Sequence, residues 1–242
     1  MGKIVDARFK HPTTFLINGP SQSGKSTYVD ALLRNQRKFF DQPFDYIYVY
    51  IGTDSDQNPL FRDMVKDLSS SKVDCQLIEL KKIYGDNVKT LCEKFPKELE
   101  KNLAAQCNQG KKGCVIFDDL MKELANCDVI MSLFTKFSSH LNVTVIFITQ
   151  NLFHRGSARS DAATIYRNAR NVVLFHTPND ASVVRNIASR LNVNSKTLHN
   201  ILKSQRSLTI RNDFQLEHPA LRLCANIFAT TPIEHQTCYT ID

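Results

Sequence analysis

Short apolar runs alternate along the chain with longer segments that mix apolar and polar residues. Six runs rich in β-branched and aromatic residues predict strands, and they lie at 14–17, 45–51, 73–80, 114–117, 143–149 and 171–175. The run at 45–51 is apolar on both faces, which is typical of a strand covered on both sides of a parallel sheet. The run at 143–149 is the clearest strand in the sequence.

The segments between these runs have helical spacing. They predict helices at 28–33, 60–68, 88–106, 121–140, 179–191 and 195–204, with one more in the polar loop after 150. We expect the helix at 88–106 to be interrupted, or to begin afresh, near Pro96, because proline lacks a backbone donor. Strands that alternate with helices predict an α/β fold of three layers with a mostly parallel central sheet.

The length of 242 residues suits one large domain, or one domain with an appendage. We assign residues 1–191 to a core and residues 192–242 to a short C-terminal extension packed on that core. The extension has strand-like pieces at 207–211 and 221–228.

Composition and charge narrow the class of protein. The chain is 42% hydrophobic and 23% charged, as in soluble globular proteins. Its longest apolar runs, about seven residues, fall far short of the ~20 that a membrane span needs, so we expect no membrane partner. A net charge of +7 favours a polyanionic partner such as nucleic acid, although ordinary solvated surfaces are also often basic.

The seven cysteines are scattered singly, without a C-x-x-C pair, and this pattern predicts a reduced intracellular protein with buried thiols. A grouping near the C-terminus matches no zinc-site spacing, so no metal site is predicted there; it consists of His218, Cys224, His235 and Cys238.

A phosphate-binding signature, G-x-x-x-x-G-K-S, stands between the first predicted strand and the first predicted helix. It comprises Gly19, Pro20, Ser21, Gln22, Ser23, Gly24, Lys25, Ser26 and Thr27. The glycines allow the backbone N–H groups to surround a phosphate, which the helix N-terminus also attracts. Lys25 would neutralise phosphate charge, and the Ser26 hydroxyl would ligate Mg²⁺. The alternative is an ordinary glycine-containing turn; the flanking strand and helix favour nucleotide binding.

An acidic pair follows the strand at 114–117. An apolar strand that ends in a carboxylate is the Walker B pattern, in which Asp118 would hold Mg²⁺. Asp119 would then act as the base that deprotonates the attacking water, with Glu123 as a weaker candidate. The alternative is that the pair merely caps a helix.

Gln150 follows the strand at 143–149, and its amide is placed to sense a γ-phosphate or the attacking water. The alternative is an amide that satisfies nearby loop backbone. Motor ATPases have an extra strand with a polar sensor between the P-loop and Walker B strands, whereas small-molecule kinases usually do not. Several arginines come next in the chain, and among them we favour Arg159 as a finger that reaches a neighbouring subunit.

These segments together resemble viral genome-packaging ATPases of the FtsK/HerA superfamily, as in poxviruses and in Polinton/Maverick-type and adintovirus-like elements. The similarity runs from about Thr13 to Leu191, and its most specific part is the stretch from Thr149 to Phe153. It implies a RecA/ASCE-like P-loop NTPase in which Lys25 and Ser26 belong to Walker A. Asp118 would be the metal-binding acid and Gln150 the sensor, but many relatives have Glu where this chain has Asp119.

The resemblance implies a motor that uses ATP and Mg²⁺ to thread double-stranded DNA into a preformed capsid. It also implies a homo-oligomeric ring, commonly a hexamer, that meets capsid or portal components in the host cytoplasm or nucleus. The lysine pairs at 81–82 and 111–112 are candidate DNA contacts, although ordinary loop charge explains either pair equally well. The residues alone leave two alternatives open: a P-loop phosphotransferase acting on a nucleoside or nucleotide, and a non-catalytic nucleotide-binding scaffold.

Overall fold

The computed structural model describes residues 8–52, 59–85, 87–120, 124, 128–150, 159–176, 181–205, 207–211, 222–225 and 237–239. Within them lies one nine-stranded sheet in the order β3-β2-β4-β5-β1-β6-β7-β8-β9. The strands are β1 (Thr14–Asn18), β2 (Tyr46–Ile51), β3 (Asp74–Glu79), β4 (Gly113–Asp118), β5 (Val143–Thr149), β6 (Asn171–Phe175), β7 (Ser207–Arg211), β8 (Arg222–Ala225) and β9 (Thr237–Tyr239).

The six strands from β3 to β6 in this order are parallel, and β7, β8 and β9 continue the sheet antiparallel. This confirms the predicted α/β fold with a mostly parallel sheet. The strand β9 was not predicted, because its three residues carry no apolar run.

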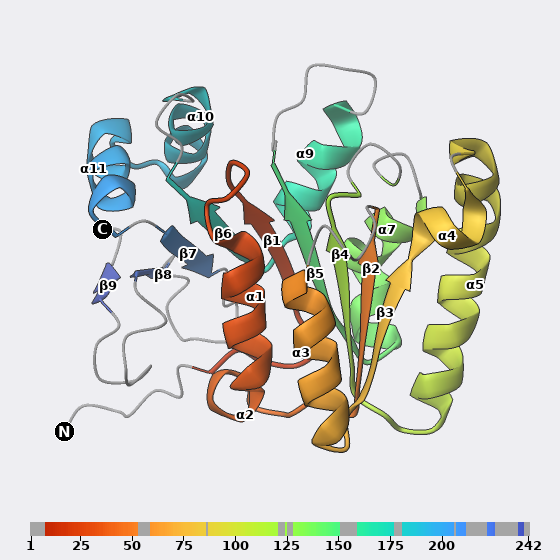
Figure 1. Cartoon of the computed structure of the whole chain (residues 1–242). Helices are drawn as coiled ribbons and strands as arrows, with labels where there is room; N and C mark the ends of the chain where they lie inside the picture. The colour runs from red at the N-terminus through yellow and green to blue at the C-terminus, as the bar shows by residue number, and fades with distance from the viewer. Residues whose placement is uncertain are drawn as a thin grey trace.

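The helices cover both faces of the sheet. They are α1 (Lys25–Arg34), α2 (Gln36–Phe39), α3 (Pro59–Ser70), α4 (Leu80–Tyr84), α5 (Val88–Asn108), α7 (Asp128–Ser132), a π-helical turn η2 (Leu133–Phe137), α8 (Ser138–His140), α9 (Arg159–Asn168), α10 (Ala181–Leu191) and α11 (Ser195–Gln205). In Figure 1, α1 and α3 lie in front of the sheet, and α7 and α9 lie behind it. Among the described residues, none of these helices is long and apolar enough to cross a membrane.

Alternate residues of the central strands supply two separate hydrophobic cores. On β2, Tyr46, Tyr48 and Tyr50 enter the core with α5, whereas the residues between them enter the core with α1 and α3. The strands β1, β2 and β5 are buried along their whole length. Burial on both faces explains why their sequences are nearly continuous apolar runs.

The helix α5 runs unbroken through Pro96, so the predicted interruption at that residue was wrong. Leu91, Phe95, Leu99 and Leu103 recur every four residues along α5, and all are buried in the core behind the sheet. Burial of this stripe outweighs the hydrogen bond that proline removes from the helix.

Three other helix predictions need correction. The short helices α2 and α4 were not predicted, and Leu80, which we assigned to the third strand, begins α4. From Asp128 onward, the helix predicted at 121–140 is a succession of α7, η2 and α8. Within 121–127, only Leu124 is described.

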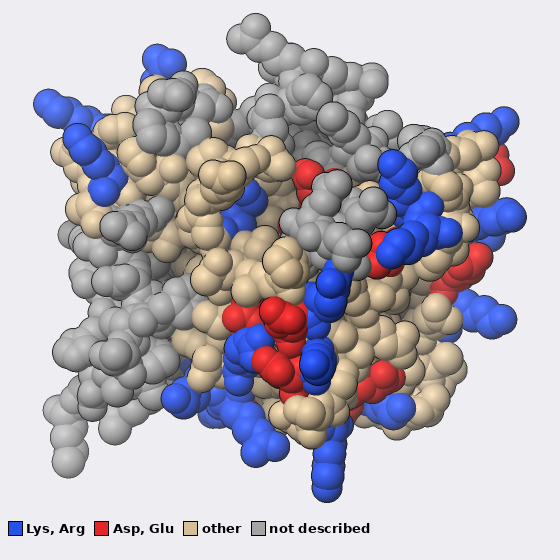
Figure 2. Space-filling view, viewed as in Figure 1, with Lys and Arg blue, Asp and Glu red and all other residues tan. Residues whose placement is uncertain are grey.

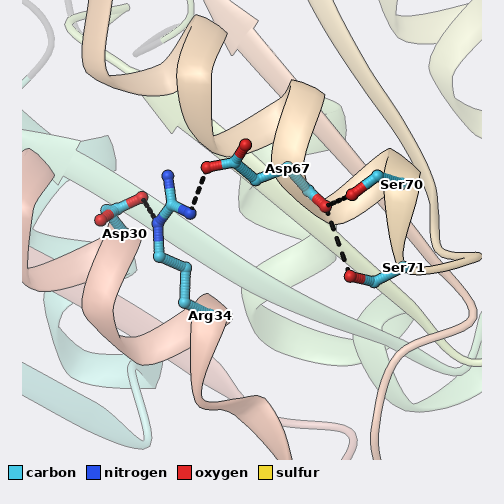
Figure 3. A network of polar contacts seen from close by, with 5 residues as sticks. All are labelled: Asp30, Arg34, Asp67, Ser70 and Ser71. Carbon is cyan, nitrogen blue, oxygen red and sulfur yellow. Dashed lines mark hydrogen bonds and ion pairs between the residues drawn. The ribbon is translucent and has the colours of Figure 1, made fainter.

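An ion-pair network ties α1 to α3 on the front face. Arg34 donates to Asp30 over 2.7 Å and to Asp67 over 2.5 Å, and the carbonyl of Asp67 accepts from Ser70 and Ser71 (Figure 3). Because the Asp67 side chain is 59% exposed, we expect this link to contribute no more than about 1 kcal/mol. The orientation of α1, whose first turn carries Lys25 and Ser26, is set mainly by its residues that are buried in the core.

The C-terminal part continues the same sheet. The strand β7 pairs antiparallel with β6 in the register Leu174↔Leu208, and α11 packs against α10 and contacts β7. The proposed domain boundary at 191/192 stays a prediction. Two members of the grouping that we rejected as a metal site, His218 and His235, lie outside the described residues.

Candidate active site at the carboxyl ends of the strands

The strand order brings three predicted site segments to one edge of the sheet. The strand β5 lies between β1, which leads into the P-loop, and β4, which carries Asp118. Asn18 on β1 is level with Thr149 on β5, and Asp118 is level with Ile148. Two strand spacings, about 10 Å, therefore separate the P-loop strand from the acidic pair. This confirms the extra strand that we expected between them.

The P-loop is shaped by left-handed backbone and close packing. Gly24 caps α1 at a φ of 97°, a conformation that costs glycine little. Gly19 has no room for a side chain, because an added Cβ would lie 2.5 Å from the Cβ of Phe175 on β6. The N–H of Gly19 donates to the carbonyl of Thr149 over 3.3 Å. The loop is thus fastened to both strands that flank β1.

Lys25 is held inside this loop. It is only 8% exposed, and its Nζ donates to the carbonyls of Gly19 over 2.8 Å and Pro20 over 2.7 Å. Burial lowers the pKa of Lys25, while the carboxylates of Asp118 and Asp119 act in the opposite direction. The ammonium therefore stands where the loop surrounds it and within the electrostatic reach of both acids.

Gln150 connects the P-loop to the acidic pair. Its Oε1 accepts a hydrogen bond from the hydroxyl of Ser21 over 3.0 Å, and its Nε2 donates to Oδ1 of Asp119 over 3.3 Å. All three side chains are exposed at the strand ends. Asp119 adopts a left-handed backbone with a φ of 54°, a conformation that is uncommon outside glycine but that aspartate adopts more readily than most residues.

Sequence reasoning placed Ser21 in the P-loop but missed its contact with Gln150. No sequence signal identifies that contact, because it depends on which strand adjoins β1. Among the buried side-chain atoms that have no hydrogen-bond partner in the described residues, two lie at the P-loop: Oδ1 of Asn18 and Oγ of Ser23. Buried polar groups are nearly always paired in native proteins, so these atoms fit a site that takes a polar ligand.

A divalent cation would meet a suitable donor set here. Ser26 lies half-buried in the first turn of α1, and Asp118 ends β4. Hydroxyl and carboxylate oxygens are ligands that Mg²⁺ favours. No contact between the two residues is needed, since water and phosphate oxygens normally complete such a coordination sphere.

For Arg159, the predicted arginine finger, the structure describes the backbone alone. Arg159 begins α9, and its side chain lies outside the described residues, as do Arg155 and Glu123. Arg170 precedes β6 and donates to the carbonyl of Pro12, so it lies at the opposite edge of the sheet from the P-loop.

A P-loop on β1, an acidic pair after β4 and an inserted β5 with its polar Gln150 define a P-loop ATPase of the RecA/ASCE-like class. The family model described as "Poxvirus A32 protein" matches residues 5–207, so the chain belongs to the poxvirus A32 protein family. This is the family of viral genome-packaging ATPases, and it confirms the resemblance seen in the sequence. Membership implies a nucleotide with a divalent metal, a DNA substrate and an oligomeric assembly.

One solved structure supports the fold, and two others resemble the chain at lower TM-scores. VirB4 of Thermoanaerobacter pseudethanolicus is 9% identical, with a TM-score of 0.52 over 95% of this chain and 89% of its own. The flagellar accessory protein FlaH from Methanocaldococcus jannaschii is 16% identical, with a TM-score of 0.47 over 84% and 86%. EccC (ATPases 2 and 3) of Thermomonospora curvata is 11% identical, with a TM-score of 0.41 over 69% of this chain, which spans 30% of the EccC chain. No curated protein matches the chain.

Replacing Lys25 by methionine separates stability from nucleotide binding. The variant keeps the length of the side chain and removes an ammonium whose pKa burial lowers, so the nucleotide-free protein should melt no lower than the wild type. Because the pKa of Lys25 is lower in the folded protein, the charged form costs the wild type stability at neutral pH. This cost disappears as the pH rises toward 10.5, the ordinary lysine value, so the wild type gains stability relative to the variant over that range. ATP should raise the melting temperature of the wild type but not of Lys25→Met.

Lys66→Met, an exposed lysine on α3, is the matched control and should respond to ATP like the wild type. If ATP stabilised Lys25→Met as much as the wild type, Lys25 would not belong to the nucleotide site.

Proposed function

We propose that this chain hydrolyses ATP to move double-stranded DNA into a preformed viral capsid. The observation that carries the proposal is the Gln150 amide, which bridges the P-loop and Asp119 from a strand inserted between theirs. A side chain in that position senses the state of the nucleotide and the catalytic acid together. Family membership supports the same reading.

The triphosphate would bind in the P-loop, which consists of residues Gly19 to Thr27. The ammonium of Lys25 donates to two loop carbonyls in the nucleotide-free protein. It would donate to the β- and γ-phosphates instead when the triphosphate binds. Ser26 and Asp118 would hold Mg²⁺, which supplies charge neutralisation at the phosphate oxygens when bound. The backbone N–H groups that precede α1 would bind the remaining phosphate charge.

Asp119 is our proposed general base. Its carboxylate already accepts a hydrogen bond from Gln150, which holds it at the edge where the γ-phosphate would end. Entry of the γ-phosphate and water between Ser21, Gln150 and Asp119 would exchange these contacts for contacts with the ligand. Gln150 would then orient the water while Asp119 accepts its proton.

The other half of the site is assigned to a neighbouring subunit. We propose Arg159, at the start of α9, as the residue that reaches the phosphates of the next copy in a ring, commonly a hexamer. Capsid or portal components would receive the DNA from this ring.

The two lysine pairs that are candidate DNA contacts lie at opposite edges of the sheet. Lys111 and Lys112 precede β4, at the edge opposite the P-loop, while Lys81 and Lys82 lie on α4 near the nucleotide edge. Lys82 forms an ion pair with Glu79 over 2.7 Å. In Figure 2, lysine and arginine side chains gather along the lower edge of the molecule, where α2 lies. Such a basic edge supports phosphate contacts that ignore sequence, as a packaging motor requires.

The proposal is tested by the rate of ATP hydrolysis with and without double-stranded DNA. We expect DNA to stimulate hydrolysis, and added salt to reduce the stimulation because phosphate contacts are screened. Transfer of phosphate to a nucleoside, with no effect of DNA, would identify a phosphotransferase instead. Binding of ATP without turnover under all conditions would identify a scaffold.

Asp119→Asn should bind ATP with nearly the affinity of the wild type and lose turnover by a factor of at least about 100, because the amide cannot accept the proton. Isothermal titration with ATP and a phosphate-release assay measure the two quantities. Asp63→Asn, an exposed acid on α3 away from the site, is the control and should hydrolyse ATP normally. Normal turnover in Asp119→Asn would move the base role elsewhere.

A further inference from the structure

The proposed site fixes the direction of a bound nucleotide across the sheet. The strand β1 has β5 on one side and β6 on the other. The groups suited to the γ-phosphate, namely Asp118, Asp119 and Gln150, all lie on the β5 side. A nucleoside triphosphate is a linear molecule, so its nucleoside end must leave the P-loop on the opposite side, over the end of β6.

The end of β6 is packed directly against the P-loop. Phe175, the last residue of β6, would touch a Cβ on either loop glycine, at 2.5 Å for Gly19 and 3.7 Å for Gly24. Its ring also meets that of Tyr28 on α1 edge-to-face, with 6.0 Å between ring centroids. The backbone of the next residue, His176, therefore follows directly on a side chain that packs against the phosphate-binding loop.

His176 pairs with a second histidine from the C-terminal part of the chain. The rings of His176 and His199 have centroids 5.7 Å apart and planes inclined by 58°. His199 lies on α11 next to Leu198, which is 1% exposed and anchors that face of the helix in the core. Figure 1 shows α10 beyond the end of β6, with α11 next to it.

The Nε2 atom of His176 is buried and has no hydrogen-bond partner among the described residues. Leaving a buried imidazole nitrogen unpaired is costly, so such an atom calls for a partner such as a ligand, an ion or an ordered water. Elsewhere in the chain the contrast is clear: both ring nitrogens of the buried His11 are paired, with Thr144 over 2.9 Å and with Asn142 over 3.1 Å. The ring of His11 is thus satisfied within the fold, whereas Nε2 of His176 is left available to a ligand.

We propose that His176 and His199 form the nucleoside subsite of the ATP site. Nε2 of His176 hydrogen-bonds to the base or ribose, and the imidazole of His199 lines the same subsite from α11. The subsite makes the C-terminal part of the chain a functional component of the nucleotide site. This inference rests on the proposed function, because it takes the P-loop to bind a nucleoside triphosphate.

Binding of ATP and of inorganic tripolyphosphate to the full chain tests the subsite by isothermal titration. Tripolyphosphate has the phosphate chain without the nucleoside, so a nucleoside contact cannot affect it. His176→Ala should weaken ATP binding about tenfold, the effect of losing one hydrogen bond, and should leave tripolyphosphate binding unchanged. His199→Ala should act in the same direction, and His176→Asn, which keeps a polar group, should lose less than His176→Ala.

The exposed His140 on α8 gives the control, and His140→Ala should bind both ligands like the wild type. Unchanged ATP affinity in a folded His176→Ala protein would overturn the subsite, and so would an equal loss for ATP and tripolyphosphate. Melting curves establish that each variant is folded; if His176→Ala is not, His176→Asn and His199→Ala decide the question. Failure of the proposed function differs from both results: a chain whose P-loop takes no triphosphate would bind neither ligand as wild type, and a scaffold or phosphotransferase would bind ATP but show no hydrolysis stimulated by DNA.

Discussion

The hydrogen bonds of the Gln150 amide, to Ser21 on one side and Asp119 on the other, depend on one constraint: β5 must lie between β1 and β4. If β4 paired directly with β1, the acidic pair would lie beside the P-loop, and the Gln150 amide would not lie between the two. With β5 inserted, the gap of about 10 Å between the P-loop strand and the acids leaves room for a γ-phosphate and a water. The sheet order is thus the basis of the proposed chemistry.

On the β6 side of β1, the fold supports the P-loop. Phe175 supports the P-loop at Gly19, and the antiparallel β7 extends the sheet beyond β6, where α11 packs against α10 and contacts β7. The proposed nucleotide site therefore has its catalytic side toward β4 and β5, and the proposed nucleoside subsite lies toward β6 and α11. A buried Lys25 lies between them, held in the loop although its burial disfavours the charged form.

Local patterns predicted most of the core strands and the P-loop, because burial on both faces leaves continuous apolar runs and because the loop glycines have a fixed spacing. Features set by tertiary contacts were not predictable. The buried apolar stripe of α5 outweighs the tendency of Pro96 to end a helix. Aspartate tolerates the left-handed backbone of Asp119, but nothing in the local sequence requires it there. The Ser21–Gln150 contact joins residues 129 positions apart and needs the strand order, which local periodicity does not contain. The roles of the site residues, Arg159 among them, stay predictions.

The central claim is that ATP hydrolysis in this chain moves double-stranded DNA, and displacement of a third strand tests it most directly. A fluorescent oligonucleotide is bound as a triplex near one end of a linear duplex, and its release is followed over time. Translocation along the duplex predicts release that requires ATP and stops when a non-hydrolysable analogue replaces it. Hydrolysis stimulated by the duplex but without release of the third strand would contradict the account.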